Sequence, residues 1–503
     1  MQRITPNDAL QNWIAGLDRR VYAALIGLAI GGLAGLIGIA LTLLGPVITA
    51  GALLGGLAAL YVITDIRAAL YGLIFVLLLL PFGTFPFDLG FTPTLLDLAI
   101  GAFVLLYLLQ WMTRRRQTLE LTPVHMLILI YILWLLLAFA LGLQYGPITP
   151  NIARQFAETL LSIGLTFVLV DLLRDGAALR RLVLVIMIGV GIQAALAVGL
   201  WVMPDDLAES ILNRLSRIGY PAGSVIRYIE SNPALPERAI GTWVDPNALG
   251  GVLAISAVLI APQLFARKPV LRTRWLTWGV FALVAGALLL TFSRASFLAT
   301  AAGLSVIAFA RYRRFIPYLV VGGLLLLLLP QAQGYVQRLI EAFTGADLAT
   351  QMRLGEYGDS LELISRYPVF GVGFTGTPDI DLYTNVASMY LIMANQIGLV
   401  GVSIFIVTML GVFAYGLSTW KHALANEELE SIHLGYHAAL LTALINAAAD
   451  LYFFRIDFQG SIMLFWTTVA LALATARLAH RSSALPQNQP LSNAGASSSI
   501  LPL

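Results

Sequence analysis

The stretch VHMLILIYILWLLLAFALGL, residues 124–143, is twenty residues long and contains no acidic residue, lysine or arginine. A helix of about 20 apolar residues crosses the hydrocarbon core of a bilayer. Similar apolar runs recur from Val21 to Leu473, and only 11% of the chain is charged. The pattern predicts an all-α integral membrane protein. It excludes an outer-membrane barrel, whose strands alternate polar and apolar residues.

The lengths of the apolar runs predict about 12–14 transmembrane helices joined mostly by short segments. Either of the early runs, 46–64 or 67–81, is alternatively a re-entrant segment. The expected spans are 21–44, 46–64, 67–81, 93–112, 124–143, 155–173, 182–203, 243–265, 275–292, 296–310, 315–330, 386–417, 432–451 and 456–476.

Two long loops containing short helices divide the chain into blocks of transmembrane helices. We expect the ends of the chain to be cytoplasmic, with an interfacial helix at the N-terminus and a disordered C-terminal tail. The expected divisions are the N-terminus 1–20, the N-terminal helices 21–203, the first long outer loop 204–242, the central helices 243–330, the second long outer loop 331–385, the C-terminal helices 386–476 and the tail 477–503.

The arginines predict the orientation. With the N-terminus inside, 20 of the 30 Lys and Arg residues fall in cytoplasmic segments, including those at 114–116, 174–181, 267–274 and 311–314. The positive-inside rule weighs short loops most heavily. The prediction is a multi-pass protein of the cytoplasmic (inner) membrane with both termini in the cytoplasm and both long loops outside.

Composition removes several classes of chemistry. The chain has no cysteine, which excludes disulfides, thiolate nucleophiles and cysteine metal sites. No nucleotide-binding signature is present, and no cofactor or nucleic-acid partner is expected. The five histidines all fall outside the two long loops, and the carboxylates there have no recognisable ligand spacing, so no metal is predicted.

Arg238 is the first candidate for binding an anion. It lies at the end of the first long loop, just before Asp245-Pro246-Asn247, which is a helix-start signature with Asp as the cap and Pro at the first helical position. Both arginine and a helix N-terminus attract anions. The alternative is an arginine at the level of the lipid headgroups, paired with Glu237.

Arg294 is the second candidate. Residues 275–310 must cross the membrane twice, which leaves each limb about 27 Å long against a core of about 30 Å. The turn carrying Ser293 and Arg294 is therefore drawn toward the membrane, where a buried arginine needs an anionic partner or a wet cavity. The alternative is an arginine that reaches lipid phosphate.

Arg353 is the third candidate. It shares one face of a predicted helix with Glu356 and Ser360, and this helix should end before Pro368. The alternative is an exposed ion pair between Arg353 and Glu356. The segment after the helix contains Gly371-Val372-Gly373, whose backbone N–H groups could approach an anion, although a plain turn explains the glycines equally well.

These features, in this order, resemble the O-antigen ligase/polymerase family over roughly 230–400. The resemblance implies an inverting, metal-independent membrane glycosyltransferase that takes a glycan from undecaprenyl diphosphate at the outer face. Ligases move the glycan to lipid A core, and polymerases extend another lipid-linked glycan. By resemblance, the donor diphosphate would be held by Arg238, Arg294 and Arg353, with support from Gly241, Asn247, Ser293, Gly371 and Gly373.

The chain departs from the family at one position. Ligases of the family carry a histidine at the start of the helix after the long loop, and this chain has Ala387 there. The departure favours a polymerase or a divergent glycan transferase over a lipid A core ligase. A carboxylate would then accept the proton from the acceptor, with Glu356 as the first candidate and Asp379 and Asp381 as the next.

Two other functions fit the same sequence pattern. A transporter or flippase of lipid-linked glycans, or of another small anion, would also place arginines in an outward cavity. A scaffolding subunit whose arginines bind membrane lipids is the second alternative. Turnover of a lipid-linked glycan by the purified protein discriminates between them.

Overall fold

The computed structural model describes residues 65–85, 90–317, 348–378 and 386–484, together with residue 382 and isolated positions within 18–49 and 320–324. Residues 1–69 and 70–503 form two separate compact units, and most of the described residues belong to the second. The predictions that lie wholly or largely outside the described residues are the interfacial helix within 1–20, the spans 21–44, 46–64 and 315–330, and the candidates Asp379 and Asp381.

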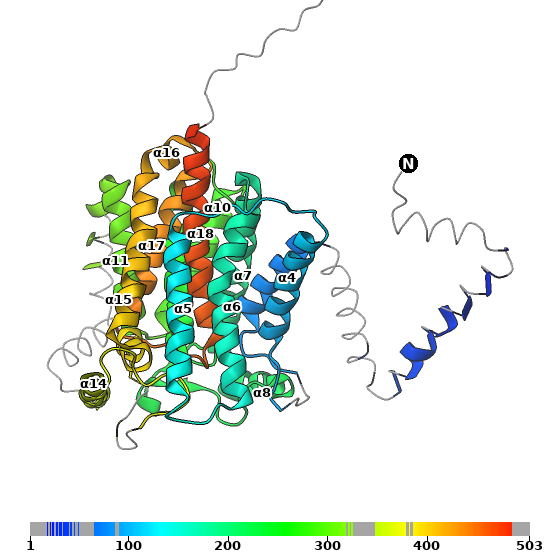
Figure 1. Ribbon diagram of the computed structural model, residues 1–503, viewed down its shortest axis with the longest axis horizontal. Coiled ribbons are helices and arrows are strands. Elements are labelled where there is room, and N and C mark those ends of the chain that lie inside the picture. The colour runs from blue at the N-terminus through cyan, green and yellow to red at the C-terminus, as the bar shows by residue number, and fades with distance from the viewer. Residues whose placement is uncertain are drawn as a thin grey trace, which may run out of the picture. The chain divides into compact units, whose positions relative to one another are not determined.

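Long helices make up the described part of the second unit (Figure 1). Seven are long and apolar enough to cross a membrane: α4 (Leu95–Met112), α5 (Val124–Gly142), α6 (Pro150–Leu172), α7 (Gly176–Val202), α9 (Pro246–Phe265), α15 (Met389–Ser418) and α18 (Gln459–Ala484). Four shorter helices accompany them: α3 (Ile66–Leu79), α10 (Arg274–Leu290), α11 (Arg294–Ala310) and α17 (Glu430–Asn446). The chain is therefore an all-α integral membrane protein, as predicted.

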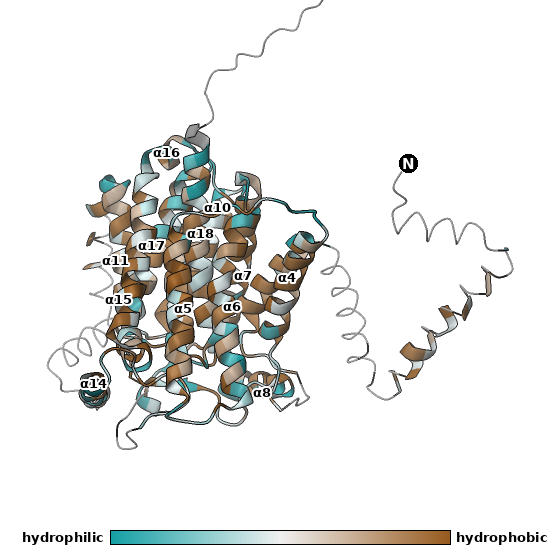
Figure 2. Cartoon of the chain, viewed as in Figure 1, coloured by the Kyte–Doolittle hydropathy of each residue, from teal (hydrophilic) through white to brown (hydrophobic). Residues whose placement is uncertain are grey.

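Two helices form the centre of this bundle. In the apolar stretch of α9, 94% of the residues are buried, and in that of α18 all are buried. In α4 the buried share is only 22%. The outer helices consequently expose leucine and isoleucine side chains, and Figure 2 shows hydrophobic residues along the whole length of α4 and α5. Exposed apolar faces of this extent are typical of helices that contact lipid.

Polar caps set where the helices begin. Asp245 caps α9 by accepting hydrogen bonds from the backbone of Asn247 (2.7 Å) and Ala248 (3.1 Å), and Pro246 is the first helical residue, as predicted. Thr149 caps α6 in the same way, so α6 begins five residues before the predicted span 155–173. The predicted span began too far along the chain because only the apolar part of the helix was used to define it.

The two predicted long loops are partly helical. The first contains α8 (Asp205–Arg214), two short 3-10 helices (Leu215–Ile218 and Ile229–Ser231) and an antiparallel pair of strands, β1 (Arg227–Tyr228) and β2 (Glu237–Arg238). The second contains α14 (Leu348–Arg366), which ends before Pro368 as predicted. In Figure 1, α8 and α14 lie at one end of the bundle, and the short α16 (Trp420–Ala425) lies at the other.

Helix α15 is broken at Gly398, which has φ +70° and ψ 173°. The segment that follows α14 enters this break: Leu399 N donates to Pro368 O at 2.8 Å, and Val372 N donates to Asn395 O at 2.8 Å. A Cβ at Gly398 would lie 2.0 Å from a backbone oxygen of that segment, so only glycine fits there. The break therefore fixes the chain after α14 to the middle of α15.

At the α16 end, α18 continues to Ala484, beyond the predicted start of a disordered tail at 477. Arg477 and Arg481 each contact Glu120 Oε2 at 2.8 Å. These ion pairs hold the last turns of α18 against the connection between α4 and α5, so the prediction was wrong for residues 477–484.

Candidate active site

Arg238 joins three segments at the α14 end of the bundle. Its Nε donates to Thr291 O at 2.8 Å, and its Nη2 donates to Asn247 Oδ1 at 2.6 Å. The next residue supports this arrangement, because Ala239 N donates to Leu290 O at 2.8 Å. The guanidinium group thus bridges the turn between α10 and α11 and the first turn of α9, which agrees with the expected position of Arg238 beside a helix start.

Arg238 lies in a partly buried and strongly charged environment. Burial lowers the pKa of its guanidinium, Asp245 raises that pKa, and Arg294 lowers it again. The group stays charged, since an arginine is not deprotonated in proteins. Arg238 and Arg294 are therefore close enough for their charges to repel each other, and an anion between them would relieve this repulsion.

Arg294 is the first residue of α11, directly after Ser293. Helices α10 and α11 have 17 residues each, so the expected hairpin with short limbs is present. The Oγ of Ser293 lies 3.0 Å from the Oγ of Ser296, which donates to Asn446 Oδ1 at 3.1 Å. Gly250 makes this packing possible, because a Cβ there would lie 2.7 Å from Ser296 Oγ.

The expected shared face of α14 is turned toward α15. Glu356 Oε2 accepts a hydrogen bond from Ala387 N at 3.1 Å, and Ser360 Oγ donates to Asn395 Oδ1 at 3.0 Å. Glu356 thus lies at the start of α15, beside the place where the family's histidine was expected. Arg353, one turn before Glu356, belongs to the same face.

Asp450 connects the arginines. It lies between α17 and α18 and is only 4% exposed. Arg353 and Arg238 both stabilise its negative charge, while Asp245 disfavours it. Since Arg238 also interacts with Arg294, electrostatic interactions link all three predicted arginines at one end of the bundle.

Sequence reasoning missed two residues of this site. Asp450 lies at the end of the predicted span 432–451, and nothing in its spacing linked it to the arginines. Tyr452 is the second, and it interacts electrostatically with Asp245 at the start of α9 and with Asp450. An acidic residue and a tyrosine at the end of an apolar helix were the available signal.

The predicted supporting glycines have conformational roles. Gly241 has φ +51°, and a Cβ there would lie 2.3 Å from Gln193 Nε2. Gly371 and Gly373 also have positive φ, and their N–H groups donate to backbone oxygens: Gly371 to the carbonyl of Tyr367, and Gly373 to a carbonyl of α15 at 2.9 Å. The structure thus supports the plain turn over an anion-binding loop.

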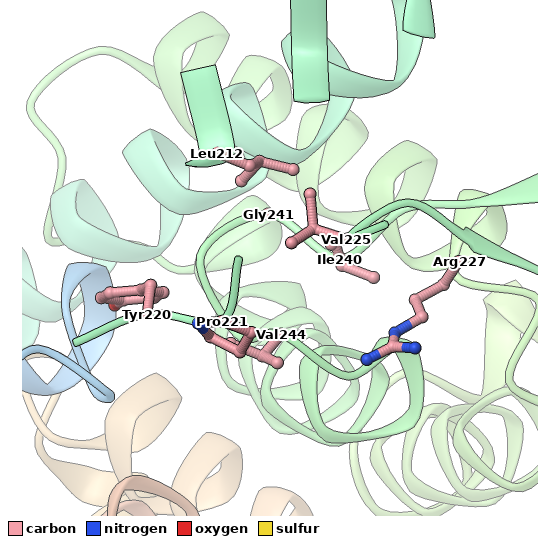
Figure 3. A pocket seen from close by; sticks show the side chains of 8 residues that line it. All are labelled: Leu212, Tyr220, Pro221, Val225, Arg227, Ile240, Gly241 and Val244. Atoms are coloured by element: carbon pink, nitrogen blue, oxygen red, sulfur yellow. The ribbon is translucent and has the colours of Figure 1, made fainter. Parts of the chain in front are cut away.

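A small cavity of about 20 Å³ lies beside the strand pair (Figure 3). In Figure 3 the Arg227 side chain extends toward it from β1, and Arg227 is the register partner of Arg238. Arg227 is therefore a fourth arginine in this region that the sequence did not single out. The cavity is lined by Leu212, Tyr220, Pro221, Val225, Arg227, Ile240, Gly241 and Val244.

The histidine pair of α17 lies away from the arginines, toward the α16 end of the bundle. His433 and His437 pack against each other on α17, and His433 Nε2 lies 3.2 Å from Gly416 O, in the part of α15 that leads to α16. Within the described ranges, no group of three or more histidines, cysteines and carboxylates is arranged to hold a metal ion.

Residues 279–406 match a family model described as O-antigen ligase. This region is similar to the O-antigen ligase family. It contains Arg294, Arg353, Glu356 and the broken helix α15, and Arg238 contacts it through Thr291. No curated protein matches the chain. The chain is thus a multi-pass membrane protein in which residues 279–406 resemble a glycan-handling family.

Proposed function

We propose that this protein is a membrane glycosyltransferase that transfers or polymerises a glycan from an undecaprenyl-diphosphate donor at the outer face of the cytoplasmic membrane. The observation that supports this proposal best is the electrostatic coupling of Arg238, Arg294 and Arg353 at one end of a membrane bundle. A donor diphosphate is the kind of anion that guanidinium groups bind.

The proposed chemistry depends on the leaving group. Cleavage of the bond between the anomeric carbon and the diphosphate places charge on phosphate oxygens, and fixed guanidinium groups stabilise that charge as it develops. Arg238 is suited to this role because Nε and Nη2 anchor it, whereas none of the described residues accepts a hydrogen bond from Nη1. Attack from the side opposite the diphosphate would invert the anomeric centre without a metal ion.

The acceptor hydroxyl would attack from the side where α14 meets α15. Glu356 remains a candidate base there, although one of its oxygens already accepts the Ala387 N–H. Asp379 and Asp381 are also still candidates by their place in the sequence before α15.

Ala387 supports a polymerase or another glycan transferase in preference to a lipid A core ligase. The position lies at the start of α15, and its backbone is held by Glu356 and by the Tyr357 hydroxyl, 3.4 Å from Ala387 O. A histidine at this position would have its imidazole attached to a backbone that is already held in place. Ala387→His should therefore gain transfer to lipid A core if only the base has been lost.

A flippase of lipid-linked glycans is the second candidate function. A broken helix such as α15 is a feature of transporters. Here, however, backbone hydrogen bonds from residues 368–373 occupy the break, so the helix halves cannot rock freely about it. This observation favours the transferase.

The test uses purified protein and lipid-linked glycans extracted from membranes of the source cells. Release of undecaprenyl diphosphate together with longer glycans indicates a polymerase, and glycan on lipid A core indicates a ligase. Arg294→Ala and Arg353→Ala should abolish release, whereas Arg217→Ala, an exposed arginine of the first loop, should not. Movement of intact donor across a vesicle membrane, without release, would replace the transferase with a flippase.

A further inference from the structure

Asp450 places a buried carboxylate beside the start of α15. Its backbone oxygen accepts a hydrogen bond from Met389 N at 2.8 Å, and Met389 is two residues after Ala387. Its side chain is buried, and Oδ2 makes no hydrogen bond with any of the described residues. An unpaired carboxylate oxygen therefore lies near the position of the missing histidine.

Polar and charged side chains in the described part of the chain surround the carboxylate of Asp450 without forming an ion pair with it. The Asn446 side chain favours the charged form of Asp450, and Asn446 Oδ1 accepts a hydrogen bond from Ser296 Oγ at 3.1 Å. Arg353 and Arg238 act on its charge, yet among the described residues neither lies within salt-bridge distance of it. Oδ2 is thus a buried acceptor with no hydrogen-bond partner among the described residues.

The charged surroundings of Asp450 suit a group that must take up a proton near neutral pH. Burial raises the pKa of Asp450 to about 7, against the opposing effect of Arg353. Asp245 raises this pKa further, Arg238 lowers it, and Tyr452 is the other titratable group that interacts with it. A base works best when its pKa is close to the pH at which the reaction runs.

We infer that Asp450 is the catalytic base that deprotonates the acceptor hydroxyl in place of the family's histidine. In this step the acceptor O–H bond breaks and its proton moves to Asp450 Oδ2. The acceptor oxygen forms a bond to the anomeric carbon, and the bond from that carbon to the diphosphate oxygen breaks, with its electron pair leaving on the diphosphate. Glu356, by holding Ala387 N, is then a positioning residue.

This inference rests on the proposed function, and two variants test it. Asp450→Asn keeps the shape of the side chain but cannot accept the proton, so it should lower turnover by about 10²–10⁴-fold. Binding of undecaprenyl diphosphate should survive, which also shows that the variant is folded. Glu356→Gln keeps a carbonyl oxygen for Ala387 N and should lower turnover less.

Added formate distinguishes a base from a structural residue. Asp450→Ala should regain part of its turnover when formate is supplied, whereas Asp450→Asn should not, because its amide fills the site. In the wild type, turnover should rise with pH through about 7, and this rise should be absent in Asp450→Asn.

Three results would overturn the inference. The first is an Asp450→Asn variant as active as the wild type, and the second is an inactive variant that no longer binds undecaprenyl diphosphate. The third is a pH dependence that survives in Asp450→Asn. A wild-type protein without any turnover would refute the proposed function itself. This outcome is distinct from the three results that refute the role of Asp450 alone.

Discussion

Replacing Arg238 by lysine separates the geometry of its guanidinium group from its charge. Arg238 reaches Thr291 O with Nε and Asn247 Oδ1 with Nη2, which leaves both N–H groups of Nη1 and one of Nη2 for a phosphate oxygen. A lysine has a single ammonium group and cannot hold both anchors while contacting the donor. Arg238→Lys therefore keeps the positive charge and loses at least one anchored contact.

The size of the effect follows from the hydrogen bonds. A hydrogen bond made by a charged group contributes about 1.5–3 kcal/mol. If one such bond is lost from the transition state, kcat/KM falls roughly 10- to 150-fold, since about 1.4 kcal/mol corresponds to a factor of ten. Arg238→Ala removes at least two and should lower kcat/KM by about 10²–10⁴-fold.

The assay measures initial rates of undecaprenyl diphosphate release by purified variants, with Arg217→Ala as the exposed control from the same loop. Thermal unfolding in detergent is recorded in parallel, because Arg238 also ties β2 to α9 and to the turn before α11. A lysine variant that releases diphosphate at the wild-type rate would refute the need for the guanidinium geometry. Equal losses in Arg238→Ala and in the control would refute a specific role altogether.

Three further predictions concern topology, stability and pH. The chain lacks cysteine, so Ser224→Cys and Ser365→Cys should react with an impermeant reagent on intact cells, and Ser418→Cys only after permeabilisation; the reverse pattern would invert the orientation. Asp171 is fully buried between Arg116 and Arg174, so Asp171→Asn should destabilise the protein by about 3–5 kcal/mol. The melting temperature in detergent should fall, and an unchanged value would contradict a structural role for Asp171. Burial raises the pKa of Glu237 from 4.5 to about 7. Between these pH values the folded state keeps a proton that the unfolded chain releases, so the stability of the protein should fall as the pH rises from 4.5 to about 7. Glu237→Gln should remove this fall in thermal unfolding scans, and an unaltered slope would contradict it.

The parts of the fold that depend on local sequence were predictable. The apolar runs gave the helices, Asp245-Pro246 marked the start of α9, and Pro368 limited α14. The 36 residues of 275–310 allowed only a tight hairpin at Arg294. In each case the interactions that decide the structure lie within a few residues of one another.

The parts that depend on packing between distant segments were not predictable. Asp450 joins Arg238 and Arg353 only because the connection after α17 folds against the start of α15. Gly398 looked like part of a continuous span, and its break needs the segment that follows α14. The extension of α18 depends on Glu120, more than 350 residues earlier in the chain.

The chain is anchored on both sides of residues 377–385, so the position of α14 does not depend on the length of this segment. Backbone hydrogen bonds fix residues 368–373 on α15, and Met389 is fixed on the connection after α17. Lengthening a loop whose ends are fixed costs only about 0.6 kcal/mol for each doubling. Changes of length or sequence between these two anchors therefore leave α14, with Arg353, in place.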